Sequence, residues 1–348
     1  MIRVTNGITE NKLQEIEQKH WQWFKDNKLK NLIIKMKSNE SLVKVFFKDK
    51  NEFDNWMDKE NGESYIKWFK RQDDKKFNIF KDFILGKREK LIELKDDIGE
   101  IYDINEEDSI NKYFKNMYTE FRSANDGWCG SELINSLGVK VCPYCNRTYI
   151  DSYRINANGK IKSNAQIDHF YSKDKYPYLA LSLYNLIPSC SSCNHSKGNN
   201  QNEVVYPYTE QFGNEGKFTT EFESDDEIYK YDLSYLYGKS DNFKILLNIK
   251  EESNIKNSIE ASNKVFKLEE IYNCYKQQVK DLLLKNVIYD TTTINELYNN
   301  YSNLFESKED LIRIIFATYV EQDDLGKVPL AKLYRDILED CGFDFLEI

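Results

Sequence analysis

Long apolar segments are absent from this chain of 348 residues, because no run of about eighteen consecutive apolar residues occurs anywhere in it. The first thirty or so residues also lack the basic, apolar and small-residue order of a secretory signal peptide. Neither GxxxxGK(S/T) nor GxGxxG occurs, so the sequence excludes ATP binding through a P-loop. Together these absences predict a cytoplasmic protein with no membrane partner.

Histidine and cysteine are scarce, with three and seven residues in the chain. Two of the histidines and four of the cysteines nevertheless fall inside one window of about sixty residues. Within it, Cys142 and Cys145, and then Cys190 and Cys193, form two CxxC knuckles, the spacing that places four thiolates around one structural Zn²⁺. Paired knuckles favour a metal over disulfides and indicate a compartment that keeps thiols reduced. The sequence predicts ordinary buried thiols at the other three cysteines, Cys129, Cys274 and Cys341.

Length and composition predict two or three packed units, because 348 residues exceed an ordinary domain and 40% of them are hydrophobic. Apolar positions recur at helical spacing in segments 8–26, 40–47, 63–94 and 109–121. We expect the aromatic residues there, and His20 with them, to pack in a core. Residues 123–130 and Gly138 break the pattern. We therefore expect a helical region over 1–138, a core with the knuckles over 139–213, and a mostly helical region over 214–348.

The cysteine window itself predicts strands. Residues 147–155 alternate in character, residues 156–159 tolerate a turn, and residues 160–170 can return as a second strand that ends in Asp168 and His169. Pro177 and the lack of a long period predict a loop over 171–183, and a short helix is expected to begin at Asn194. The expected fold is therefore mainly α with a small central α+β insert.

The net charge of −9 is unevenly distributed. Residues 141–200 hold seven basic and three acidic side chains, a local net charge of +4, which leaves −13 for the rest of the chain. A polyanion requires positive charge at the contact surface and not over the whole molecule, so this distribution is compatible with nucleic-acid binding in the window. An acidic remainder is equally compatible with a basic partner protein or with solubility alone.

An Asp-His pair, an Asn and an Asn-x-x-Lys sequence follow one another around the second knuckle, at Asp168, His169, Asn185, Asn194 and Lys197. With the two knuckles, this order resembles that of the HNH endonucleases of the His-Me finger type over residues 142–199. The resemblance implies a ββα-metal core, in which two strands and a helix surround one divalent ion, with a zinc site of four cysteines and helical flanks. It also implies a metal-dependent endonuclease that hydrolyses phosphodiester bonds, with DNA as the expected substrate.

The resemblance further implies a role for each residue. His169 would take a proton from the attacking water, and Asn185 would hold the loop and orient His169. Asp168 and Asn194 would bind the catalytic Mg²⁺ or Mn²⁺. His195 stands one residue past the slot that Asn194 fills, so either side chain is a candidate ligand. The basic side chains predicted to contact nucleic acid are Arg147, Lys173, Lys175 and Lys197.

Other interpretations of the same residues remain open. A zinc-stabilised domain that docks onto nucleic acid or a partner without catalysis needs the cysteines but not His169, and an interaction subunit with a decayed nuclease site is a further alternative. The run 168–198 more narrowly resembles HNH subunits of bacterial anti-phage systems, such as Septu-type and retron-associated nucleases. That resemblance implies a companion ATPase subunit. A restriction enzyme that recognises modified DNA is an alternative among nucleases.

Overall fold

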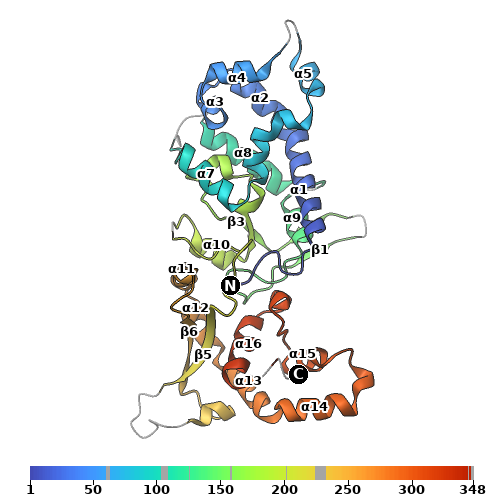
Figure 1. Cartoon of the computed structure of the whole chain (residues 1–348), viewed down its shortest axis with the longest axis vertical. Coiled ribbons are helices and arrows are strands. Elements are labelled where there is room, and N and C mark those ends of the chain that lie inside the picture. The colour runs from blue at the N-terminus through green and yellow to red at the C-terminus, as the bar shows by residue number, and fades with distance from the viewer. Residues whose placement is uncertain are drawn as a thin grey trace. The chain divides into compact units, whose positions relative to one another are not determined.

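A computed structural model describes residues 1–59, 63–102, 109–124, 126–156, 159–200, 202–223, 233–343 and 345. The chain forms two compact units, each made of segments that are not contiguous in the sequence. The helical unit comprises Ile8–Gly138 and Ser152–Ile187, and the cysteine unit comprises Met1–Gly7, Val139–Asp151 and Pro188–Ile348. The described part is mainly α-helical with three small two-stranded sheets, as the sequence predicts (Figure 1).

The helical unit consists mostly of helices, which confirms the helical spacing read from its sequence. In its described residues these are α1 (Glu10–Phe24), α2 (Lys30–Met36), α3 (Glu40–Phe46), α4 (Lys50–Met57), α5 (Tyr65–Arg71), α6 (Asn78–Leu85), α7 (Arg88–Ile98), α8 (Ile110–Ser123) and α9 (Gly130–Leu137). A π-helical turn at Lys25–Leu29 joins α1 to α2. The strands that follow are β1 (Ser152–Arg154), β2 (Ile161–Ser163) and β3 (Gln166–His169).

Polar residues start several of these helices. Asn39 Oδ1 accepts a hydrogen bond from the Leu42 N–H at 2.8 Å before α3, and Ser109 Oγ accepts one from the Lys112 N–H at 3.0 Å before α8. The first N–H groups of a helix have no partner inside it, so such caps decide where a helix begins.

Aromatic side chains dominate the core of the helical unit. The ring of Phe46 on α3 lies 4.5 Å from that of Phe83 on α6, measured between centroids. Trp68 on α5 is fully buried, and Trp21 and Phe24 on α1 are nearly so. The prediction that these residues pack in a core, and do not form a base-stacking platform, is confirmed.

The cysteine unit combines two longer strands with helices. Its strands β5 (Gly216–Phe222) and β6 (Phe243–Ile249) pair antiparallel with Phe218 opposite Leu247, and the helix α16 (Ala331–Asp340) packs on β5. Its described helices are α10 (Ser191–Lys197), α11 (Lys256–Phe266), α12 (Leu268–Tyr272), α13 (Lys276–Ile288), α14 (Thr291–Asn300), α15 (Lys308–Phe316) and α16 (Ala331–Asp340). The sequence predicts a mostly helical region over 214–348 and does not single out β6. Residues 224–232 of this region lie outside the described residues.

The strand that ends in His169 has a different partner from the one predicted. The hairpin is confined to β1 and β2, in which Tyr153 lies opposite Lys162. β3 pairs instead with β4 (Leu186–Ser189), from which the chain continues directly into α10. The predicted hairpin over 147–155 and 160–170 is therefore confirmed where β1 pairs with β2, and it is wrong beyond Ser163, because β3 pairs with β4. All four residues of β4 are buried, and such a strand gives no alternation to read.

Two further boundaries differ from the prediction. α10 begins at Ser191 and not at Asn194, because the sulfur of Cys190 accepts a hydrogen bond from the Cys193 N–H and acts as the N-cap. The predicted loop over 171–183 contains a 3₁₀ turn at Pro177–Leu179, whose first position suits the restricted φ of proline, and a second 3₁₀ turn, Leu183–Asn185, begins at its last residue.

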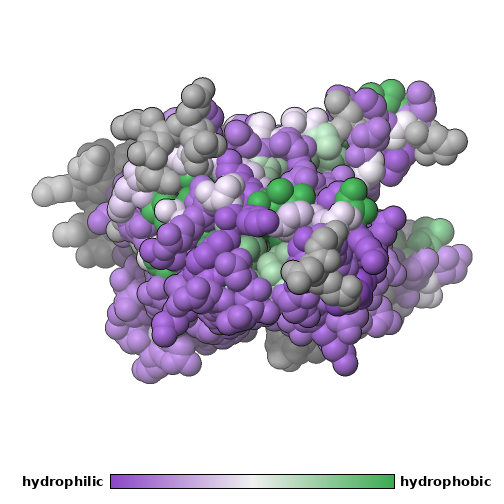
Figure 2. Space-filling model, turned by 90° about the horizontal axis from the view of Figure 1, so that it is seen from above, coloured by the Kyte–Doolittle hydropathy of each residue, from purple (hydrophilic) through white to green (hydrophobic). Residues whose placement is uncertain are grey.

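None of the helices in the described ranges combines the length and apolar character that crossing a membrane requires. The face in Figure 2 is largely hydrophilic, with its hydrophobic residues in small patches. This face agrees with a sequence in which 31% of residues are charged.

Candidate functional site

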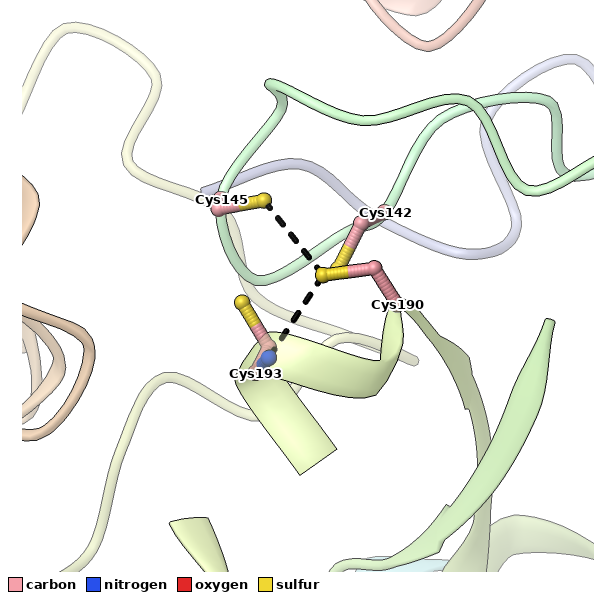
Figure 3. A group of neighbouring side chains, drawn as sticks. All are labelled: Cys142, Cys145, Cys190 and Cys193. Atoms are coloured by element: carbon pink, nitrogen blue, oxygen red, sulfur yellow. Dashed lines mark hydrogen bonds between the residues drawn. The ribbon is translucent and has the colours of Figure 1, made fainter. Parts of the chain in front are cut away.

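Four cysteine side chains converge in the cysteine unit. Cys142 and Cys145 come from the first knuckle, Cys190 caps α10, and Cys193 lies in the first turn of that helix. Their sulfurs point into one space (Figure 3), and all four lie within 4.8 Å of one another. The Sγ atoms of Cys145 and Cys190 are 4.0 Å apart. At most 4% of any of the four residues is exposed, so the cluster is closed to solvent.

This arrangement fits a zinc ion. Tetrahedral Zn²⁺ with Zn–S bonds of about 2.3 Å holds its sulfurs about 3.8 Å apart, close to the spacing of the cluster. All seven cysteines of the chain are free thiols, so no disulfide competes for the four. Four protein ligands leave no position for water or substrate, which is the character of a structural and not of a catalytic zinc site.

The crowded thiols change one another's acidity. Hydrogen bonds from the other three cysteines lower the pKa of Cys190, whereas contacts with the other three raise the pKa of Cys193. A divalent cation would relieve this conflict, because it stabilises all four thiolates together. Burial acts to lower the pKa of Arg147, but a hydrogen bond with Tyr275 and the charge of Cys145 outweigh it and raise that pKa. The Arg147 guanidinium, predicted to contact nucleic acid, thus interacts with Tyr275 and Cys145 beside the cluster.

Asn146 anchors the first knuckle, a role that the sequence-based prediction missed. Its backbone lies in the left-handed region at φ +46°. Its Nδ2 donates to the carbonyl of Leu325 at 2.8 Å, and its Oδ1 accepts from the Lys332 N–H at 2.9 Å. Nearby, the Tyr272 hydroxyl donates to the carbonyl of Cys145 at 2.6 Å. The available signal was an asparagine directly after a CxxC knuckle, since asparagine tolerates positive φ.

The helical unit holds the predicted general base. Asp168 and His169 end β3, and both are buried. His169 Nε2 lies 3.0 Å from the carbonyl oxygen of Ala180, and the ring packs edge-on against Tyr118 at 4.4 Å. A carbonyl oxygen only accepts hydrogen bonds, so Nε2 carries a hydrogen. In the neutral imidazole the basic lone pair is therefore on Nδ1.

Asn185 holds the loop that faces β3. Its Oδ1 accepts from the Tyr171 N–H at 2.7 Å, and its Nδ2 donates to the carbonyls of Tyr171 and Leu179, each at 3.0 Å. Its own carbonyl accepts from the Phe170 N–H at 2.9 Å. The Oδ1 and Nδ2 atoms of Asn185 thus connect the segment after His169 to the loop before β4.

His20 anchors the same loop from α1. Its Nε2 donates to the carbonyl of Leu181 at 2.8 Å, and its Nδ1 accepts from the Trp128 indole N–H at 3.1 Å. Leu181 directly follows Ala180, so two neighbouring carbonyls of one loop are held by two histidines. The predicted burial of His20 is confirmed, but a lone histidine on a helical face gave no indication of these partners.

The pKa of His20 makes stability depend on pH. Burial lowers this pKa to about 4 from its ordinary value of 6.5, because the charged imidazole would lose its hydration, and the hydrogen bond to the Leu181 carbonyl opposes only part of that effect. Below pH 6.5 His20 is protonated in the unfolded chain, whereas in the folded chain it stays neutral until about pH 4. The free energy of unfolding therefore falls as the pH falls through this window. We expect the free energy of unfolding to fall by about 2 kcal/mol between pH 7 and 5 from this group.

The measurement is urea unfolding of wild type and His20→Gln at pH 7 and 5. Glutamine can still donate to the Leu181 carbonyl but does not titrate, so the variant should lack this part of the decline. Equal declines in the two proteins would contradict the assignment.

The other predicted ligands of the catalytic ion, Asn194 and His195, lie on α10 in the cysteine unit, as does the predicted phosphate contact Lys197. Asn194 is half-buried, His195 is exposed, and Lys197 is only 3% exposed. The structure thus groups these three residues with the cysteines, and groups Asp168, His169 and Asn185 in the helical unit.

The other two predicted phosphate contacts have neighbours in the helical unit. Lys175 forms an ion pair with Glu100 at 3.2 Å, with 20% of its side chain exposed. Lys173 Nζ lies 5.9 Å from the centre of the Tyr118 ring, within the range of a cation–π contact.

The cysteines outside the cluster differ in exposure. Cys129 is buried, Cys341 is half-buried, and Cys274 is exposed. The prediction of a buried thiol at Cys274 is therefore wrong. This residue lies in the 3₁₀ turn Asn273–Tyr275, none of whose residues is buried.

The two knuckles and the predicted catalytic residues fall in a segment with known relatives at the family level. No curated protein and no solved structure matches the chain. Residues 142–200 match the family model described as HNH endonuclease, a segment that begins at the first knuckle and runs past the end of α10. Residues 142–200 therefore form a segment that matches the HNH endonuclease family model and carries a four-cysteine cluster that fits zinc.

Proposed function

We propose that this protein is a metal-dependent endonuclease that hydrolyses phosphodiester bonds of DNA. The observation that carries the proposal is the environment of His169, the last residue of the buried strand β3. The Nε2–H of this histidine donates a hydrogen bond to the Ala180 carbonyl. An imidazole held in one tautomer presents Nδ1 as the base that an attacking water needs. The match of residues 142–200 to the HNH endonuclease model supports this class of reaction.

The proposed mechanism assigns the proton transfer to His169 Nδ1. Asn185 keeps the loop with Ala180 against β3 and so preserves the orientation of the ring. Asp168 and Asn194 would hold the catalytic ion, with His195 as the alternative to Asn194, because oxygen donors suit Mg²⁺ or Mn²⁺. When bound, such an ion neutralises charge that develops on the phosphate and on the leaving oxygen. Lys197 would contact a flanking phosphate.

His169→Ala is expected to slow plasmid cleavage by at least about 100-fold, since a positioned general base contributes about 10² to 10⁴ in rate. Supercoiled plasmid would be incubated with each protein, at matched zinc content, in metal-stripped buffer with added Mg²⁺ or Mn²⁺. Cys274→Ala is the matched control, because Cys274 is exposed and outside the cluster. It should cleave at the wild-type rate.

The outcomes separate the proposal from its alternatives. Equal cleavage by wild type and His169→Ala would reveal a contaminant or another site. Absence of cleavage by every protein, on DNA and on RNA, would favour a zinc-stabilised docking subunit without catalysis.

We further propose a cytoplasmic role in anti-phage defence, in which a companion ATPase restrains or triggers the nuclease. The support is the similarity of residues 168–198 to HNH subunits of such systems, together with the absence of a P-loop pattern in this chain. Affinity purification of the tagged protein from its native host should recover an ATPase in stoichiometric amount. Recovery of the nuclease alone, before and during phage infection, would contradict the proposed partner.

A further inference from the structure

The β1–β2 hairpin has one covered face and one open face. α9 packs against both strands, and Arg154 of β1 forms an ion pair with Glu132 of α9 at 3.5 Å. Ile161, directly opposite Arg154, is 8% exposed. Side chains alternate between the two faces of a strand, so Tyr153 and its opposite residue Lys162 project from the face that does not carry Arg154.

The open face carries an aromatic ring beside positive charge. Tyr153 is 60% exposed and Ile155 is 58% exposed, and Lys162 and Lys160 are exposed as well. Residues 152–163 contain three basic and no acidic side chains, in a chain whose net charge is −9. A large exposed aromatic residue beside lysines, without a carboxylate in the hairpin, suits a ligand with flat rings and negative charge.

The hairpin also lies a short length of chain from His169. Lys162 precedes His169 by seven residues, and both belong to the helical unit. A fully extended chain spans at most about 3.6 Å per residue, so the two residues are at most roughly 25 Å apart. One strand of nucleic acid covers this distance in about seven nucleotides at 3.4 Å each. A single substrate molecule can therefore reach both positions.

We propose that the open face of the β1–β2 hairpin binds unpaired nucleotides of the substrate, beside the cleavage site. Tyr153 stacks on a base, and Lys160 and Lys162 contact the flanking phosphates. Stacking on a protein ring requires a base that is free of its own neighbours in the strand, so this surface selects single-stranded or opened DNA over intact duplex. The inference rests on the proposed nuclease function and adds to it a preference for the form of the substrate.

The test is fluorescence anisotropy of the full-length, zinc-loaded protein with a labelled single-stranded oligonucleotide and with its duplex, without added Mg²⁺ or Mn²⁺. Tyr153→Ala should weaken single-strand binding about tenfold, and Tyr153→Phe should retain it, because stacking needs the ring and not the hydroxyl. Tyr102→Ala is the matched control at an exposed tyrosine outside the hairpin and should bind like wild type. Lys162→Ala should make the negative slope of log affinity against log salt shallower by about 0.7.

Two results would overturn the inference. One is equal single-strand binding by wild type and Tyr153→Ala. That result would mean that the open face binds another ligand, such as a protein. The other is tighter binding of duplex than of single strand by wild type. Plasmid cleavage by wild type is measured separately, so that the two proposals can be distinguished. If wild type cleaves plasmid and Tyr153→Ala binds single strands as wild type does, the hairpin proposal fails and the nuclease proposal stands. The unfolding midpoint of each variant, expected to match wild type, controls for folding.

Discussion

Cys145→Ala is expected to abolish zinc binding and to unfold much of the cysteine unit. Structural zinc contributes about 10–16 kcal/mol in small peptides at pH 7, which is comparable with the whole stability of a typical domain, about 5–15 kcal/mol. The variant keeps three buried thiols in a space of less than 5 Å but has lost one of the four ligands that hold the ion.

The damage should spread beyond the knuckle, because the loop between and after its cysteines carries contacts to distant helices. The Tyr272 hydroxyl at the end of α12 is bonded to the Cys145 carbonyl. Asn146 is bonded to Leu325 and to the Lys332 N–H near the start of α16. Both helices lose an anchor when the knuckle opens.

Zinc content and amide hydrogen exchange of each helix are the measurements. Wild type and Cys274→Ala should keep one zinc and strong protection of α12 and α16, and Cys145→Ala should lose both. Tryptophan fluorescence reports on the helical unit alone, because all five tryptophans lie there: Trp21, Trp23, Trp56, Trp68 and Trp128. Full zinc content and native protection in Cys145→Ala would show that the cluster is not the metal site.

Lys332→Met is expected to destabilise the cysteine unit by about 3–5 kcal/mol, the typical effect of leaving one charge of a buried pair alone. Lys332 and Asp336 are both fully buried on α16, where the ammonium contacts both carboxylate oxygens. Burial lowers the pKa of Lys332 and raises that of Asp336, which shows that each charge is costly without the other. Asp336 also accepts a hydrogen bond from the Phe218 N–H of β5 at 3.0 Å.

The double variant Lys332→Met/Asp336→Asn should recover most of the loss, because asparagine still accepts from the Phe218 N–H and no charge remains buried. Lys217→Met is the matched control, since Lys217 pairs with Glu339 at 2.6 Å but is partly exposed. That change should cost less than about 1 kcal/mol. Urea unfolding followed by circular dichroism measures all four proteins. A double variant as unstable as Lys332→Met alone would contradict the coupling.

The parts of the site that depend on local spacing could be predicted from the sequence. Two CxxC knuckles bring four sulfurs together wherever the chain folds back, and the cluster at Cys142, Cys145, Cys190 and Cys193 follows from that. The helices of residues 1–138 were readable for the same reason, since a helix repeats its apolar face within a few residues.

Partners chosen across long stretches of sequence could not be predicted. β3 pairs with β4 and not with the nearer hairpin strand. All four residues of β4 are buried, so its sequence shows no alternation from which a pairing could be predicted. His20 meets Leu181 across 161 positions, and Asn146 meets Leu325 across 179. Each is an ordinary polar residue in the sequence and gains its role only from the carbonyl that it reaches.

The division of the chain between the two units has a consequence for protein synthesis. All residues of the helical unit precede position 188, whereas the cysteine unit needs everything from Pro188 to the end. The second knuckle follows the first by 45 positions, which a ribosome adds in about 2–9 seconds. During that interval the nascent chain offers only two of the four thiolates to a metal. The four-sulfur cluster can therefore form only after the second knuckle has been synthesised.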